Sequence, residues 1–151
     1  MPNTPSLIAK GASAFALGSS ATDSDATITE SLLSAVGYTC QVDESHLDAV
    51  TALSGSGPAY IFLMIEALIA GGVDHGLPVD VARDLALHTV SGAAELVIKT
   101  GDDPALLREN VTSPNGTTFA ALESFRSEDF EGTIRRAIAA AAERSRELGA
   151  G

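Results

Sequence analysis

The chain has 151 residues, of which 45% are apolar, enough for one domain with a sizeable core or for one domain plus part of another. Twenty acidic residues against nine basic ones give a formal charge of −11, which argues against a nucleic-acid partner because such partners are bound through clustered Lys and Arg. The single cysteine, Cys40, excludes an internal disulfide and a cysteine-based metal set, and we predict no metal site.

Neither a secretory signal nor a membrane span is predicted. The first residues lack a charged segment followed by an apolar stretch. The longest apolar run, Ala59–Val73, is interrupted by Glu66 and is too short to cross a bilayer, so it predicts a buried helix. We therefore expect a cytoplasmic protein with no membrane partner.

The first 44 residues predict a strand, a helix and a second strand. Small and apolar residues bounded by glycines at 11–18 are typical of a buried strand. Capping side chains at 22–25 begin a helix that Gly37 would stop, and the alternation of Tyr38–Val42 predicts another strand, with Cys40 as a small buried residue. Two strands do not make a stable sheet alone, so this segment is interpreted as the last part of an α/β domain.

From residue 45 onward every strong pattern is helical, which makes the chain mainly α. The helix beginning at Pro58 is apolar on nearly all sides, so it needs cover that about 105 residues hardly provide, and we predict a homodimer. Breaks are expected at Ser54–Pro58 and Gly76–Pro78. The predicted helices cover His46–Leu53, Pro58–Gly72, Asp80–Lys99, a stretch from Asp103 to before Ser113, Thr117–Phe125 and Asp129–Leu148.

Two loops are candidates for ligand binding. In Thr112–Thr118, a proline and a glycine fix a turn before a helix, and the unpaired N–H groups at a helix start suit a carboxylate or phosphate. Ordinary capping by the Ser and Thr side chains is the alternative for this loop. In Ser54–Gly57 two glycines permit close backbone approach to a ligand, the alternative being a glycine turn between helices.

Several segments in order along the chain resemble the sequences of pyrroline-5-carboxylate reductases. The resemblance extends over essentially the whole chain, and several motifs in register are more specific than any single one. The segments that carry it are Asp48–Tyr60, Gly76–Pro78, Val111–Thr118 and Ala141–Leu148, together with Met1–Pro5 and Gly11–Ser13.

The resemblance implies a fold and an activity. Members of this family have an N-terminal Rossmann domain and a C-terminal helical dimerisation domain of the 6-phosphogluconate-dehydrogenase-C-like type. Residues 1–44 would then be the terminal strand-helix-strand piece of an incomplete NAD(P)-binding domain, and residues 45–151 the substrate-binding and dimerisation domain. The implied reaction is the NADPH- or NADH-dependent reduction of 1-pyrroline-5-carboxylate to L-proline in proline biosynthesis, by a homodimer or an oligomer of dimers.

The resemblance also implies site residues. No histidine or carboxylate in these motifs is predicted as an obligatory base, and Asp48 is expected to be a helix-start carboxylate. Thr118 would be the catalytic hydroxyl nearest the imine nitrogen. The substrate carboxylate would be bound by Ser113, Gly116, Thr117 and Thr118. The residues expected beside the cofactor are Asn3, Thr4, Ser54, Gly55 and Pro58.

Two departures from the family pattern leave alternatives open. Asn115 stands where the family usually has a second glycine, and Asn tolerates left-handed backbone angles better than most residues. The Gly-x-Gly-x-x-Gly turn of a dinucleotide site is absent from the 151 residues, so we expect no appreciable turnover by this chain alone. One alternative is a non-catalytic dimerisation module that pairs with itself or with a full-length homologue. Another is a relative acting on a different imine or on a small 2-hydroxy acid.

Overall fold

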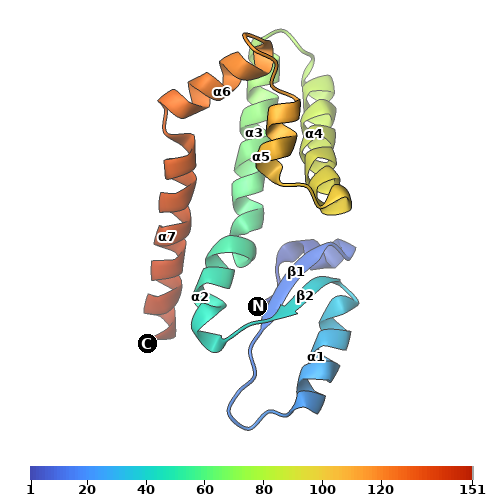
Figure 1. Cartoon of the computed structure of the whole chain (residues 1–151), viewed down its shortest axis with the longest axis vertical. Coiled ribbons are helices and arrows are strands. Elements are labelled where there is room, and N and C mark those ends of the chain that lie inside the picture. The colour runs from blue at the N-terminus through green and yellow to red at the C-terminus, as the bar shows by residue number, and fades with distance from the viewer. Residues whose placement is uncertain (151) are drawn as a thin grey trace. The chain divides into compact units, whose positions relative to one another are not determined.

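The computed structural model describes residues 1–150, which form two compact units. Met1–Ile61 and Ile134–Gly151 make up the first unit, and Phe62–Thr133 the second. The predicted boundary near residue 44 stays a prediction, because the helices after it contribute to both units. In chain order the elements are η1 Thr4–Ile8, β1 Gly11–Phe15, α1 Asp23–Ser34, β2 Gly37–Gln41, η2 Glu44–His46, α2 Leu47–Val50, η3 Thr51–Gly55, α3 Gly57–Asp74, α4 Val79–Thr100, α5 Pro104–Asn110, α6 Thr117–Ser127 and α7 Phe130–Gly149 (Figure 1).

The strand-helix-strand prediction is confirmed as a two-stranded parallel sheet. Gly11 of β1 pairs with Gly37 of β2, and the register continues to Phe15 opposite Gln41. The predicted role of Gly37 as a helix stop is wrong, because α1 ends at Ser34 and Gly37 begins β2 with φ +148°. A Cβ atom on Gly37 would overlap the backbone of Gly11, so the glycine allows the two strands to pair closely at their starts.

The predicted start of α1 is confirmed as a capping box. Thr22 Oγ1 accepts a hydrogen bond from the Asp25 backbone N–H, and the Thr22 backbone N–H donates to Asp25 Oδ2 over 2.8 Å. The Thr22 hydroxyl also donates to Asp25 Oδ2, and this bond, with the backbone bond second, lowers the pKa of Asp25 below its ordinary value of 3.8.

This capping box predicts a local dependence on pH. Because the pKa of Asp25 is lower in the folded chain, its contribution to α1 is present above the unfolded pKa and is lost as the pH falls through the folded pKa. In a titration followed by the carboxyl ¹³C shift, Asp25 should titrate below 3.8, and Thr22→Ala should bring its pKa back toward 3.8. Identical pKa values for Asp25 in the two proteins would contradict the assignment.

The buried residues of the first unit lie on β1 and on the helical turn η3. Ser13, Ala14 and Phe15 are buried, and Ala52 has no exposed surface. Far along the chain, Ser145 Oγ of α7 donates to Asp48 Oδ1 over 2.6 Å. Asp48 lies in the first turn of α2, as expected for a helix-start carboxylate. Its bond to Ser145 fixes the C-terminal part of α7 against the start of α2.

Cys40 differs from its prediction. It lies in β2, as expected, but is only half-buried, and its thiol faces the Ser13 carbonyl oxygen at 3.9 Å. Helix α1 packs against β2, but it does not cover Cys40 completely, and part of this side chain is still accessible to solvent. Burial of the thiol would therefore need a further covering element.

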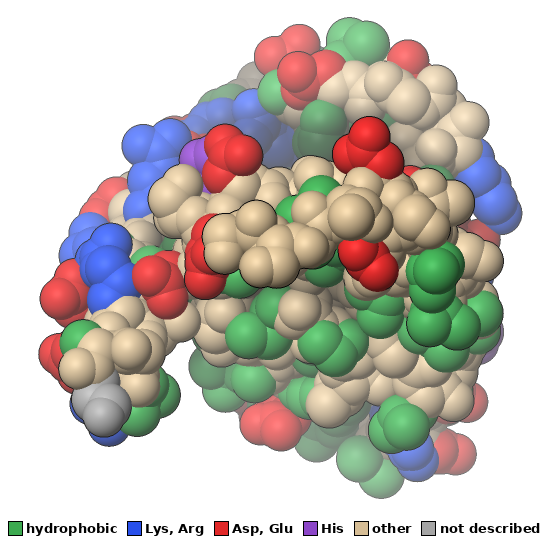
Figure 2. Space-filling view, turned by 90° about the horizontal axis from the view of Figure 1, so that it is seen from below, with side chains coloured by type: hydrophobic (Ala, Val, Ile, Leu, Met, Phe, Trp, Pro, Cys, Tyr) green, Lys and Arg blue, Asp and Glu red, His purple; other side chains and the backbone are tan. Residues whose placement is uncertain are grey.

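The second unit buries little apolar surface within this chain. Close packing occurs where α3 meets α4, since a Cβ atom on Gly72 would lie 3.1 Å from Ala82 Cβ. Among the described residues of this unit only Ala82 and Ala86 are buried. Leu63 is 68% exposed and Ile98 is 80% exposed. Figure 2, which views the molecule from below Figure 1, shows that hydrophobic side chains are open to solvent on the face turned to the viewer as well. Exposed apolar side chains of this size are typical of a surface that another chain covers.

The helix predicted to be buried, Pro58–Gly72, corresponds to α3, which contains no buried residue. It is covered on too few sides by its own chain, as its all-round apolar sequence anticipates. By length and composition alone, the helical segment Glu44–Asp74 contains an 18-residue window, with a mean hydropathy of 1.5, that is apolar enough to cross a membrane. The run Ala59–Val73, on which the sequence prediction rests, is shorter than this window. The helix in the structure extends beyond that run at both ends, and this greater length is what meets the requirement for a membrane span.

Candidate functional site

The loop that precedes α6 forms a tight turn. The Gly116 backbone N–H donates to the Ser113 carbonyl oxygen over 3.0 Å. Between them, Asn115 adopts the left-handed conformation with φ 58°, which confirms that asparagine can replace a glycine here. Gly116 is then the N-cap of α6, with an extended backbone.

The first turn of α6 has no side-chain cap. Thr117 and Thr118 are its first two residues, yet among the described residues no side chain accepts a hydrogen bond from the N–H groups at this helix start. Ordinary capping by Ser or Thr, the alternative reading of this loop, is therefore absent from the structure. The free N–H groups and the positive end of the helix dipole give the loop the character of a carboxylate or phosphate site.

The exposure of the loop suits access by a small ligand. Ser113 and Thr117 are exposed, and Thr118 is half-buried. A Cβ atom on Gly116 would overlap Ser113 Oγ, so the missing side chain at 116 leaves room for the serine hydroxyl over the helix start. The four residues predicted to bind the substrate are thus brought together in one turn of the second unit.

The second candidate segment, Ser54–Gly57, is not the open glycine turn that the sequence predicted. The chain stays helical through η3 and widens by one residue, because the Ser56 N–H donates to the Thr51 carbonyl oxygen over 2.8 Å. Such π-turns recur at functional sites. A Cβ atom on Gly55 would lie 3.3 Å from Met1 Sδ, whereas one on Gly57 would meet nothing within 4 Å, so backbone is open to a ligand at Gly57.

Side chains donate hydrogen bonds to the backbone carbonyl groups of this widened turn. Tyr60 Oη donates to the Ala52 carbonyl oxygen over 3.0 Å, and Asn3 Nδ2 donates to the Ser54 carbonyl oxygen over 3.0 Å. The Ser54 hydroxyl itself donates to the Val50 carbonyl oxygen. Sequence reasoning did not single out Tyr60, because a hydrogen bond to a carbonyl group eight residues earlier is not part of the regular α-helical pattern.

The residues expected beside a cofactor all lie in the first unit. Asn3 reaches Ser54 directly, and its Oδ1 accepts from the Ala12 N–H over 2.9 Å. Thr4 begins η1, Gly55 ends η3 and Pro58 is the second residue of α3. Asn3, Ser54 and Gly55 therefore belong to one connected turn, while their contact with a cofactor stays a prediction.

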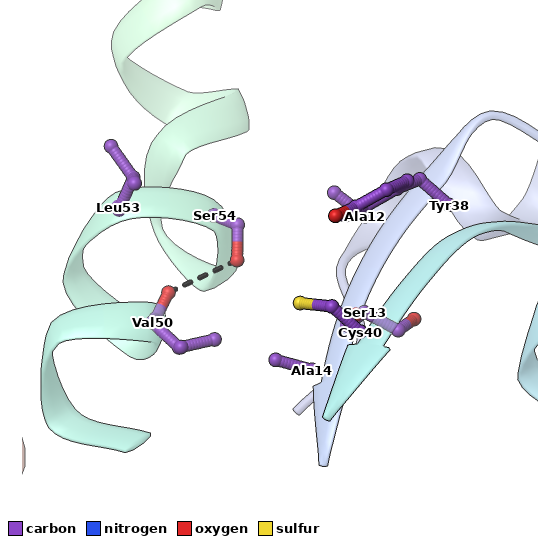
Figure 3. Close-up of a pocket in the computed structure, with 8 residues that line it drawn as sticks. All are labelled: Ala12, Ser13, Ala14, Tyr38, Cys40, Val50, Leu53 and Ser54. Atoms are coloured by element: carbon purple, nitrogen blue, oxygen red, sulfur yellow. Dashed lines mark hydrogen bonds between the residues drawn. The ribbon is translucent and has the colours of Figure 1, made fainter. Parts of the chain in front are cut away.

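A cleft of about 260 Å³ lies between this helical segment and the sheet (Figure 3). Val50 and Ser54 face the strands, and Ala14 and the Cys40 sulfur point toward them. The lining is apolar, so the cleft suits the flat face of a ring better than a charged group. The lining residues are Ala12, Ser13, Ala14, Tyr38, Cys40, Val50, Leu53 and Ser54.

Comparison with known proteins places these features in a family context. Residues 44–148 match the family model described as pyrroline-5-carboxylate reductase dimerisation. A pyrroline-5-carboxylate reductase of Arabidopsis thaliana is 52% identical over 148 residues, which cover 98% of this chain and 54% of the relative. One of Synechocystis is 46% identical over 149 residues, covering 99% of this chain and 56% of the relative. The chain thus spans about half the length of the curated relatives it matches.

Solved structures agree with the sequence relatives. A pyrroline carboxylate reductase of Plasmodium falciparum, described with NADP bound, superposes with a TM-score of 0.93 at 34% identity, covering 99% of this chain and 61% of its own. A pyrroline-5-carboxylate reductase of Coxiella burnetii gives a TM-score of 0.94 at 38% identity, covering 98% of this chain and 55% of its own.

Proposed function

The chain belongs to the pyrroline-5-carboxylate reductase family, and on that premise we propose that it is the C-terminal portion of an oxidoreductase that reduces 1-pyrroline-5-carboxylate to L-proline. The observation that carries the proposal is the uncapped start of α6, where the Ser113–Thr118 turn leaves N–H groups free to bind a carboxylate. NADPH or NADH is the proposed reductant.

The roles of the loop residues follow from their positions. The N–H groups at the start of α6, with the Ser113 and Thr117 hydroxyls, bind and orient the substrate carboxylate. Thr118 is half-buried, and its hydroxyl would donate a hydrogen bond to the imine nitrogen and pass its proton to that nitrogen as the C=N double bond becomes single, regaining a proton from solvent. The chemistry that a bound nicotinamide would supply is the hydride for the imine carbon.

The described residues fit only the nicotinamide end of such a cofactor. The backbone is open at Gly57, beside Ser54 and Gly55, and this side of the turn can accept a flat ring. The pyrophosphate needs a glycine-rich turn at a helix start, and no Gly-x-Gly-x-x-Gly sequence occurs in the 151 residues. We therefore assign pyrophosphate binding to a part of the enzyme outside these residues.

A homodimer is the proposed assembly. The description of the matching family model names dimerisation, and the matched residues, 44–148, include the whole second unit. Within that unit only two alanines are buried, while large apolar side chains of α3 and α4 are exposed. A second copy of the chain supplies the missing cover without requiring a different partner.

Ligand stabilisation tests the proposed site. L-Proline, the product, should raise the melting temperature of the 151-residue chain, whereas lactate, a small 2-hydroxy acid, should not. Stabilisation by lactate alone would favour a relative that acts on hydroxy acids. No stabilisation by proline, in a folded chain, would favour a non-catalytic dimerisation module. In the same preparation we expect no appreciable oxidation of NADPH with pyrroline-5-carboxylate, and a robust rate would overturn that expectation.

Gly116→Ala should weaken proline binding roughly tenfold, the effect of losing one hydrogen bond to a charged group. The new methyl group overlaps Ser113 Oγ and displaces that hydroxyl from the helix start. Isothermal titration calorimetry with proline measures the change. The double variant Ser113→Ala/Gly116→Ala is the control, because it should bind no more weakly than Ser113→Ala alone. A further loss in the double variant would show that Gly116 acts by another route.

A further inference from the structure

We infer that Asn3 and Tyr60 are positioning residues that hold the widened turn η3 by binding the carbonyl groups of Ser54 and Ala52, which lack their α-helical backbone donors. The inference rests on the proposed function in one respect, since Ser54 and Gly55 of this turn are there assigned to the nicotinamide side of the site. The structural part stands on hydrogen bonds within the first unit alone.

Both unpartnered carbonyl groups follow from elementary helix chemistry. In an α-helix the Ala52 carbonyl would accept from the Ser56 N–H, but that N–H donates to Thr51 instead. The Ser54 carbonyl would accept from residue 58, which is a proline and has no N–H. The Ala52 and Ser54 carbonyl groups therefore need donors from elsewhere. The Gly55 carbonyl also lacks its α-helical donor, because the Ala59 N–H donates to Ser56, and Gly55 is half-buried.

Tyr60 provides the donor for the Ala52 carbonyl group. Ala52 has no exposed surface, so water does not reach its carbonyl group, and Tyr60 Oη donates to it over 3.0 Å. A buried carbonyl without a partner is unfavourable, which makes this hydroxyl a condition for the widened turn. The other tyrosine of the chain, Tyr38, is 69% exposed and offers a matched control.

Asn3 provides the donor for the Ser54 carbonyl group and connects the turn η3 to strand β1. Its Nδ2 donates to the Ser54 carbonyl, while its Oδ1 accepts from the Ala12 N–H of β1. Both polar atoms of the side chain are thus engaged within the protein. Asn3 acts on a bound nicotinamide through the position of Ser54, and it sets the spacing between β1 and η3 on either side of the cleft.

Amide hydrogen exchange on the ¹⁵N-labelled 151-residue chain tests the inference. Asn3→Asp keeps an acceptor for the Ala12 N–H but removes the donor to Ser54, so exchange at Ser56 should accelerate about tenfold while Ala12 stays protected. Tyr60→Phe should also accelerate Ser56 about tenfold, and Tyr38→Phe should leave it unchanged. Asn110→Asp, an exposed change of the same charge, is the second control.

The outcomes separate the possibilities. Ser56 exchange within twofold of wild type in both Asn3→Asp and Tyr60→Phe would overturn the inference, as would equal acceleration at Ala12 and Ser56 in Asn3→Asp. If a variant does not fold, the wild type still decides, because slow exchange of the Asn3 side-chain amide protons is expected and fast exchange contradicts the Ser54 bond. Absence of proline and NADPH binding by the wild type would count against the proposed function and leave the exchange result intact.

Discussion

If the chain forms the proposed homodimer, replacing Leu63 by Asp should convert it to a monomer at micromolar concentration. Leu63 lies on α3 in the second unit and is 68% exposed within its own chain, so little intrachain packing is lost. Burial of a leucine side chain contributes roughly 2 kcal/mol, and twofold symmetry applies the loss twice. The dimer should weaken by about 4 kcal/mol, roughly a thousandfold in dissociation constant, before the cost of desolvating the carboxylate is added.

Light scattering coupled to size-exclusion chromatography measures this effect. Leu7→Asp is the matched control, since Leu7 is 90% exposed on η1 in the first unit and should leave the mass unchanged. A monodisperse monomer for the wild type would remove the basis of the proposed dimer. A Leu63→Asp protein that remains dimeric at low micromolar concentration would place the interface on another surface.

Gly37→Ala should destabilise the fold by about 3 kcal/mol or more, a loss typical of strained backbone combined with a steric clash. The residue has φ +148°, and its new Cβ would overlap three backbone atoms of Gly11, which no side-chain rotation relieves. Urea unfolding at fixed protein concentration measures the loss. Gly18→Ala, in an exposed loop with nothing within 4 Å of the new methyl group, should change stability by less than about 0.5 kcal/mol.

If Gly37→Ala unfolds at the same urea concentration as Gly18→Ala, the close pairing of Gly11 with Gly37 is not required for stability. That result would also weaken the account of why β2 begins at a glycine. Because the two changes add the same methyl group, composition does not explain a difference between them.

Features that depend on neighbouring residues could be predicted from the sequence. The helix over Asp80–Lys99 follows from its apolar period, and the structure has α4 at Val79–Thr100. The start of α1 follows from Thr22 and its capping neighbours. The left-handed backbone of Asn115 follows from the intrinsic tolerance of asparagine, and the turn before α6 from its proline and glycine.

Features that depend on distant partners could not be predicted in the same way. Gly37 looks like a helix stop locally, and only the approach of Gly11 shows why a glycine begins β2. Ser54–Gly57 looks like a break because of its glycines, yet donors from Asn3 and Tyr60 keep the chain helical. The substrate loop could be located, but the contacts of its residues with a ligand depend on groups beyond the chain.

Pro58 determines how substitutions at positions 3 and 58 should combine. Because its ring leaves residue 58 without a backbone N–H, the Ser54 carbonyl group has no donor from that residue. The Asn3 side-chain amide donates to this carbonyl group instead, although Asn3 and Ser54 are 51 positions apart. The positions should therefore behave as a suppressor pair. A Pro58→Ala change restores a backbone N–H at residue 58 and should relieve much of the defect of Asn3→Asp.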